Sequence, residues 1–104
     1  MITVSDLPIN ISLESIQEFC QRYGVRRLSL FGSVLREDFT PDSDVDVLVE
    51  FIPGKVPGFF GLVEMQEVLT QQLQRPVDLR TPAELSHYFR DRVLQEAFQL
   101  YDSQ

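Results

Sequence analysis

Two aspartates in one predicted strand are the residues of this sequence best suited to chemistry. Asp44 and Asp46 are separated by a single valine, so in a strand their side chains lie on the same face. A rise of ~3.3 Å per residue places their Cβ atoms roughly 6.5 Å apart. Carboxylates this close repel each other, and a divalent cation such as magnesium offsets that repulsion directly. The alternative for so short a pattern is a pair of solvated side chains at a strand edge or turn.

A glycine–serine pair that precedes these aspartates is a candidate phosphate-binding turn. Gly32 and Ser33 follow directly on the predicted strand 25–31, and ten residues separate Ser33 from Asp44. Glycine lets the backbone approach a ligand closely, and amides at the start of a helical turn can hold phosphate oxygens. Taken alone, the pair favours an ordinary strand-to-helix turn, so its meaning depends on the two aspartates.

Asp78 is the candidate for a third carboxylate. It lies between two apolar residues of the short predicted strand 77–80, so its side chain faces away from theirs. If that strand neighbours the strand of Asp44 and Asp46, the three acids can converge. The alternative is a salt bridge between Asp78 and Arg80 or another arginine.

Periodicity and capping signals predict the elements that must position these residues. The spacing predicts helices over about 13–23, 59–74 and 82–101, the last with or without a break, and strands over 25–31, 44–51 and 77–80. Ser12 and Gly24 are a typical helix cap and stop. Thr81 and Glu84 form a capping box before the last helix. This order indicates an α/β (α+β) class, with a small mixed sheet flanked by helices.

The apolar residues of the predicted helices repeat at helical spacing, and we expect them in the core. In the last helix this set comprises Tyr88, Phe89, Leu94, Phe98 and Tyr101. Cys20 lies on the apolar face of the first helix and is expected to be buried. As the only cysteine, it excludes a disulfide within the chain and a cysteine-rich zinc site.

Length and charge limit the classes of function. With 104 residues, we expect a single domain over 1–104, with the motif core at about 25–80 and no separate substrate domain. The net charge of −7 lacks the basic excess of a nucleic-acid binder. No segment has the pattern of a signal peptide or the ~18 apolar residues of a membrane span, so we expect a cytoplasmic protein without membrane contact.

The combined motif resembles that of a known superfamily. The run Leu30-Phe31-Gly32-Ser33, ten further residues and Asp44-Val45-Asp46 match the Gly-Ser-x10-Asp-x-Asp signature of the DNA polymerase β nucleotidyltransferases. The segment RRLSLFGSVLREDFTPDSDVDVLVEF resembles the minimal nucleotidyltransferase (MNT) domains, and the likeness continues through RPVDLRTP to cover about residues 22–101. Leu35 and Glu37 depart from the family, whose members often have Ala and Gly there.

The resemblance implies a polymerase β-like fold and a role for each site residue. Asp44, Asp46 and Asp78 are then the catalytic and metal-binding carboxylates, and Gly32, Ser33, Arg36 and Ser43 the nucleotide-binding residues. For Arg36, bracing of the acidic loop is an alternative to phosphate contact. The cofactor implied is Mg²⁺, as two ions bridged by carboxylates, and the substrate is ATP. The reaction implied is transfer of AMP to a hydroxyl group.

The resemblance also implies a partner. Stand-alone MNT proteins resemble the antitoxins of HEPN/MNT toxin–antitoxin modules, which are expected to adenylylate a tyrosine of the HEPN ribonuclease toxin. The first alternative is a non-catalytic antitoxin or binding module that neutralises its partner by contact alone. The second is a nucleotidyltransferase for a small molecule, although relatives with that task usually carry an added substrate domain.

Overall fold

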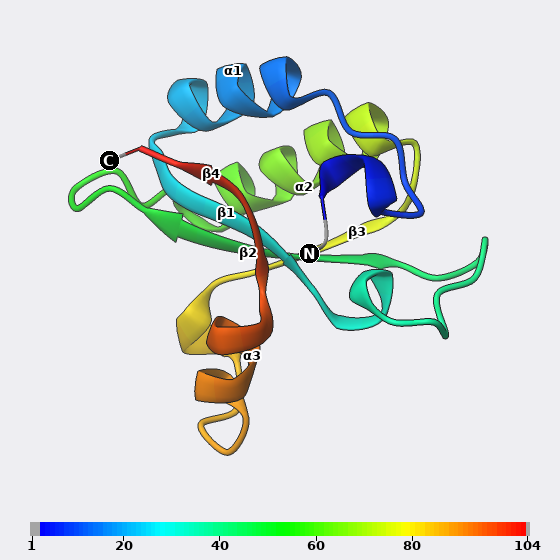
Figure 1. Ribbon diagram of the computed structural model, residues 1–104. Helices are drawn as coiled ribbons and strands as arrows, with labels where there is room; N and C mark the ends of the chain where they lie inside the picture. The colour runs from blue at the N-terminus through cyan, green and yellow to red at the C-terminus, as the bar shows by residue number, and fades with distance from the viewer. Residues whose placement is uncertain (1–2, 104) are drawn as a thin grey trace.

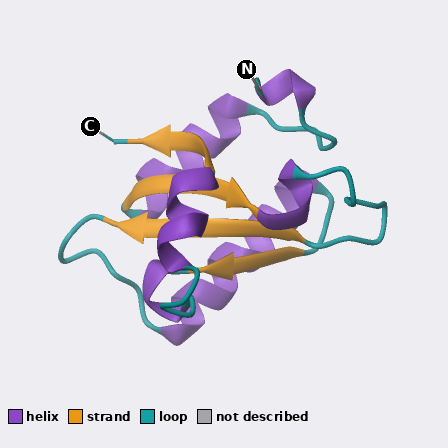
Figure 2. Cartoon of the chain, turned by 60° about the horizontal axis from the view of Figure 1, so that its bottom comes forward, coloured by secondary structure: helices purple, strands orange, loops and turns teal. Residues whose placement is uncertain are grey.

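A four-stranded mixed sheet forms the centre of the computed structural model, which describes residues 3–103. Two long helices cover one face of the sheet, and a short third helix lies on the other (Figure 1). Figure 2 shows that second face, with the short helix in front of the strands. The predicted architecture, a small mixed sheet flanked by helices, is therefore confirmed.

The elements follow one another along the chain with short connections. The helices are α1 (Leu13–Tyr23), α2 (Phe59–Leu73) and α3 (Arg90–Glu96), and the strands are β1 (Val25–Phe31), β2 (Val45–Phe51), β3 (Val77–Arg80) and β4 (Phe98–Asp102). Three 3₁₀ turns complete the set: η1 (Val4–Asp6), η2 (Gly32–Leu35) and η3 (Pro82–Glu84). The strand order is β3-β2-β1-β4; β1 is antiparallel to both neighbours, and β2 is parallel to β3.

Local sequence signals explain where α1 begins and ends. The Ser12 hydroxyl accepts a hydrogen bond from the backbone amide of Ser15 at 3.2 Å, as expected of a helix N-cap. Gly24 ends the helix in the left-handed conformation, with φ at 68°. Both predicted signals are confirmed, and β1 starts at the next residue.

The predicted last helix is wrong over most of its length. Thr81 and Glu84 do form the capping box, with the Thr81 amide donating to Glu84 Oε1 at 3.0 Å, but they start only the turn η3. The chain is helical again in α3 and then turns extended at Ala97, where ψ is 142°. Residues 98–102 form β4, because pairing with β1 gives that strand a second neighbour.

The aromatic residues of this region are consequently less buried than helical spacing predicts. Tyr88 is 87% exposed and Phe89 50% exposed, so neither belongs to the core. Leu94 is also exposed, whereas Phe98 and Tyr101 are half-buried in β4 and pack against the core from there. Tertiary strand pairing overrides the local periodicity here.

The main core lies between the sheet and the helices α1 and α2. From β2 it receives Val45, Val47 and Val49, as the predicted alternation requires. Cys20 is fully buried there, as predicted, and its burial raises the pKa of the thiol to about 12. Asp46 lies on the opposite, α3-facing side of the sheet. In residues 3–103, no helix combines the length and hydrophobicity needed to cross a membrane.

Candidate active site

The glycine turn after β1 lies directly against the second aspartate. Phe31, the last residue of β1, pairs with Asp46 across the antiparallel strands, and the backbone then turns at Gly32 with φ at 76°. A Cβ atom on Gly32 would overlap Asp46 Oδ2 and would lie 3.2 Å from Asp46 Cγ. Only glycine therefore fits this turn without strain or displacement of the carboxylate.

The third aspartate is the neighbour of Asp46 on the other side of β2. In the parallel register Asp46 pairs with Asp78, one strand spacing away. The pKa of Asp46 is raised, first by partial burial and then by the negative charges of Asp78 and Asp44. Arg36 and Arg80 oppose part of that shift. The structure thus brings the three predicted carboxylates into one electrostatic environment.

Asp78 is held by the adjacent arginine, which was the alternative considered for it. Arg80 Nε donates to Asp78 Oδ1 at 3.0 Å, and an Arg80 Nη atom donates to Oδ2 at 3.2 Å. This bidentate pairing and the nearby charges of Glu84 and Asp46 raise the pKa of Arg80. The structure therefore makes Asp78 and Asp46 register neighbours and also forms the salt bridge, and Arg80 supplies positive charge near Asp46.

Magnesium suits the donor chemistry of this cluster. Carboxylate oxygens are its preferred protein ligands, and a cation would offset the repulsion from Asp78 and Asp44 that adds to burial in raising the pKa of Asp46. In residues 3–103, no group of three or more acidic, histidine or cysteine side chains is arranged to hold a metal. Both Asp78 oxygens accept hydrogen bonds from Arg80. Coordination by all three aspartates therefore requires Arg80 to release Asp78.

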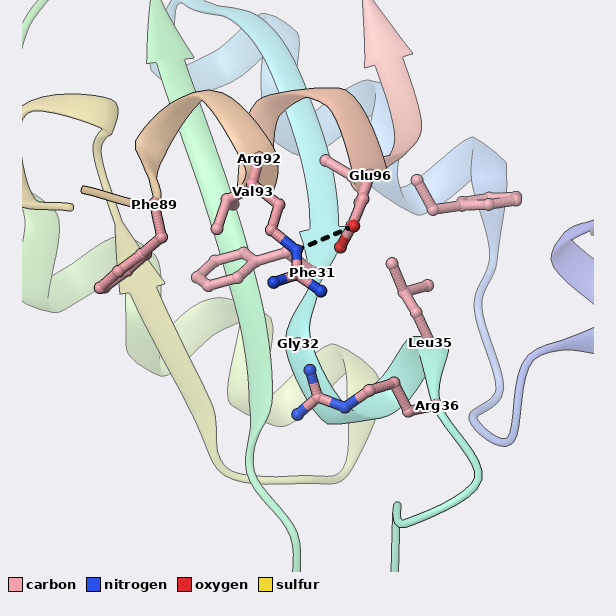
Figure 3. Close-up of a pocket in the computed structure, with 10 residues that line it drawn as sticks. Phe31, Gly32, Leu35, Arg36, Phe89, Arg92, Val93 and Glu96 are labelled. Carbon is pink, nitrogen blue, oxygen red and sulfur yellow. Dashed lines mark hydrogen bonds and ion pairs between the residues drawn. The ribbon is translucent and has the colours of Figure 1, made fainter. Parts of the chain in front are cut away.

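Arg36 lies at the mouth of the site, directly after η2. Its backbone amide donates to the carbonyl of Ser33 at 2.9 Å and closes the turn. Its Nε atom pairs with Asp38 Oδ1 at 3.3 Å, while the guanidinium ends beside Gly32 (Figure 3). The contact with Asp38 fits the bracing role considered for Arg36. Its side chain is exposed, and its charge lowers the pKa of Asp46, so the phosphate contact considered for Arg36 stays a prediction.

Ser43 organises the turn that leads into Asp44. The backbone amide of Thr40 donates to Ser43 Oγ at 2.9 Å, and the two hydroxyl oxygens lie 3.1 Å apart. The Ser43 amide donates in return to the Thr40 carbonyl at 3.0 Å. In this conformation the Ser43 side chain is therefore engaged within its own loop. Ser33, in contrast, is half-buried in η2, next to Gly32.

A residue that the sequence analysis did not select fixes the same loop from outside. Arg75 Nη1 donates to the carbonyls of Thr40 and Pro41 at 3.1 and 3.3 Å. Its guanidinium also lies over the ring of Phe39, 4.9 Å from the centroid. Thr40 is 35 positions away in the chain, and no sequence signal links it to Arg75.

A cavity of about 560 Å³ adjoins the glycine turn on the α3 side of the sheet. Phe31, Leu35 and Arg36 line it from the end of β1 and from η2, and Phe89 and Val93 line it from α3 and the residue before it (Figure 3). Phe98, at the start of β4, also belongs to the lining. Gly32 belongs to the lining, so the cavity and the candidate phosphate turn are continuous. The sequence did not predict this cavity, because the helix expected over about 82–101 left no strand at residues 98–102.

Comparison with known proteins connects this geometry to a family. A family model described as a nucleotidyltransferase domain matches residues 13–100. The protein adenylyltransferase MntA of Thermococcus cleftensis is 32% identical over 96 residues, which are 92% of this chain and 94% of that protein.

Solved structures show the same fold. A chain described provisionally as a minimal nucleotidyltransferase superposes with a TM-score of 0.68 at 32% identity, over 83% of this chain and 86% of that one. The complex of an AMPylated Shewanella oneidensis HEPN toxin with an MNT antitoxin contains a chain with a TM-score of 0.63. That match has 21% identity and covers 88% of this chain and 71% of the other, so it shows the fold alone.

Proposed function

This chain belongs to the nucleotidyltransferase domain family, and from that premise we propose that it transfers AMP from ATP to a hydroxyl group of a partner protein. One observation supports this reaction above the others. The carboxylate of Asp46 lies between the glycine turn at Gly32 and the register partner Asp78, with Asp44 close enough to influence its pKa. A phosphate-binding turn beside clustered carboxylates is the arrangement that magnesium-dependent phosphoryl chemistry requires.

Each residue of the site has a role in the proposed reaction. Asp44 and Asp46 would hold Mg²⁺, which supplies positive charge against the phosphates. The turn at Gly32 and Ser33 would hold the β- and γ-phosphates through its amides. Asp78, once free of Arg80, would accept the proton of the attacking hydroxyl. A bond then forms between that oxygen and the α-phosphorus, while the bond to the bridging oxygen breaks and pyrophosphate leaves.

The acceptor that we propose is a tyrosine of a cognate HEPN ribonuclease toxin, so that the chain acts as its antitoxin. The relative from Thermococcus cleftensis is named a protein adenylyltransferase, which favours a protein acceptor. The Shewanella oneidensis complex pairs an AMPylated HEPN toxin with an MNT antitoxin of the same fold. In this proposal residues 1–104 act as one domain, and the partner completes the acceptor side of the site.

The test is transfer of AMP to the product of the neighbouring gene. That protein is incubated with this chain, ATP and Mg²⁺, and its intact mass is measured before peptide mapping locates the modified residue. A gain of one or more AMP groups on a tyrosine supports the proposal. An unmodified partner together with AMP transfer to a small metabolite would overturn it.

A double variant separates catalysis from neutralisation by contact. Asp44→Asn with Asp46→Asn removes both charges of the pair and keeps the side-chain size. An enzyme loses both AMP transfer and relief of toxicity in this variant, whereas a pure binding module keeps full neutralisation. Binding of the partner by the variant, measured by calorimetry, shows that the fold is retained.

A further inference from the structure

We propose that the cavity between η2 and α3 binds the base and ribose of the nucleoside triphosphate. The inference rests on the proposed function and extends it to a part of the substrate that the aspartates and the glycine turn do not contact. The volume of about 560 Å³ lies within the usual range of small-molecule sites, roughly 300–1,000 Å³. Three features of the cavity favour this occupant: its place, its walls and its rim.

The place of the cavity is set by the strand order. Asp46 and Asp78 lie on β2 and β3, while the cavity is lined by Phe31 at the end of β1 and by Phe98 at the start of β4. Gly32 lies between the two regions and borders both. A triphosphate held at Gly32 therefore has carboxylates on one side and this cavity on the other.

The walls of the cavity suit a flat aromatic base. Phe31, Phe89 and Phe98 supply rings, and Leu35 and Val93 supply aliphatic surface. Phe89, directly before α3, is half exposed, so part of its ring surface is free to contact a ligand in the cavity. Stacking of a base on such rings contributes binding energy with little dependence on sequence or base identity.

The rim of the cavity suits a ribose and its phosphates. Arg36 and Gly32 both belong to the lining, and the Arg36 guanidinium ends on the Gly32 side of the cavity (Figure 3). At the opposite rim, Arg92 Nε pairs with Glu96 Oε1 at 3.1 Å, and both side chains are largely exposed. An exposed pair of this kind contributes little stability, so either partner can exchange it for a ribose hydroxyl at small cost.

Two adjacent aromatic residues provide a matched test. Phe89 lines the cavity, whereas Tyr88 is more exposed and does not line it. We expect Phe89→Ala to weaken binding of ATP with Mg²⁺ about tenfold and to leave binding of inorganic tripolyphosphate with Mg²⁺ unchanged. Tyr88→Ala should change neither affinity. Calorimetric titration of the two probes into each protein measures all four values.

A cavity-filling variant tests the same inference from the opposite direction. Val93→Trp places an indole in the cavity and should weaken ATP binding at least tenfold, while retained tripolyphosphate binding reports an intact fold and phosphate turn. Unchanged ATP affinity in both variants would overturn the inference. If the variants bind ATP normally but show a higher KM for the partner protein, the cavity receives the acceptor, and this result would also overturn the inference.

The same titrations distinguish this inference from the proposed function. If the unmodified chain binds neither ATP nor tripolyphosphate and transfers no AMP, the proposed function itself fails. If the unmodified chain binds ATP and modifies its partner, but Phe89→Ala and Val93→Trp bind ATP equally well, only the nucleoside cavity is wrong.

Discussion

The carboxylate of Asp46 lies against the Cα atom of Gly32, across the antiparallel pair β1 and β2. The register places Asp46 opposite Phe31, so the acidic side chain reaches the first residue after β1. The absence of a Cβ atom on Gly32 is what permits this approach. One contact therefore fixes the relative positions of the turn that we propose for phosphate and the carboxylate that we propose for the metal.

Replacement of Gly32 by alanine should disrupt this contact. The new Cβ atom meets Asp46 Oδ2, and the φ of 76° is unfavourable for alanine, so we expect a loss of about 3 kcal/mol in the free energy of unfolding. Displacement of the Asp46 carboxylate should also slow AMP transfer by roughly 100-fold. Denaturant titration and initial rates of transfer measure the two effects.

Gly54 is a matched control for that substitution. It has a similar φ of 83°, but a Cβ atom there would meet nothing within 4 Å. We expect Gly54→Ala to cost about 1 kcal/mol of stability from the backbone conformation alone and to leave AMP transfer unchanged. Equal losses of stability and activity in the two variants would show that the approach of Gly32 to Asp46 has no special importance.

Asp46→Asn should stabilise the protein without metal at neutral pH. The pKa of Asp46 in the folded state is raised above its ordinary value, so its charged form opposes folding above that pKa. As the pH falls, the folded state takes up a proton and this cost disappears. We expect a gain of about 0.5–1 kcal/mol at pH 7, small because the side chain is partly solvated, and no gain below about pH 4.

Thermal unfolding in EDTA at several pH values measures this effect, and Asp42→Asn is the control because Asp42 is exposed in the preceding loop. Added Mg²⁺ should reverse the order of stability, since it binds the wild-type carboxylates and stabilises the folded state by mass action. A destabilised Asp46→Asn protein in EDTA at pH 7 would contradict the repulsion inferred among the three acids.

Arg80→Gln should increase the affinity of the site for Mg²⁺. Arg80 occupies both oxygens of Asp78 and contributes positive charge near Asp46, so a metal must compete with it. Loss of that charge should tighten Mg²⁺ binding by about threefold to tenfold. Arg22→Gln, which changes an exposed arginine of α1, should have no effect on the Mg²⁺ affinity. Weaker Mg²⁺ binding in Arg80→Gln would mean that Arg80 organises the cluster instead of competing with the metal.

Arg75→Met should loosen the loop that leads into Asp44. The substitution removes two hydrogen bonds to the carbonyls of Thr40 and Pro41 and the charge over Phe39. We expect a cost of about 1 kcal/mol in stability and faster amide exchange at residues 40–44. Hydrogen-exchange mass spectrometry of this peptide tests the assignment, and exchange equal to that of the wild type would refute it.

Local signals predicted much of the fold. Ser12 and Gly24 bound α1 as expected, because a capping hydroxyl and a left-handed glycine act within a few residues of their position. The alternation along β2 placed the valines in the core and Asp46 on the other face for the same reason. The sequence placed Asp78 on the face of its strand away from the apolar residues, and the structure shows that this strand, β3, is the neighbour of β2. Asp78 therefore lies beside Asp46.

Features that depend on distant contacts were not predictable from one sequence. The residues of β4 have helical spacing, and only the unpaired edge of β1 makes them a strand. The cavity beside Gly32 exists because α3 ends at Glu96 and the chain then turns back as β4. Since β4 was not predicted, the cavity was not predicted either. The bond from Arg75 to the Thr40 carbonyl spans the whole of β2 and α2.

Anomalous diffraction from crystals grown with Mn²⁺ and a non-hydrolysable ATP analogue tests most directly whether Asp44 and Asp46 hold a cation beside the glycine turn. We predict an anomalous peak at bonding distance from an oxygen of each aspartate, with the triphosphate against Gly32 and Ser33. A nucleotide ordered elsewhere on the protein, with no peak between these two carboxylates, would contradict the assignment of the active site.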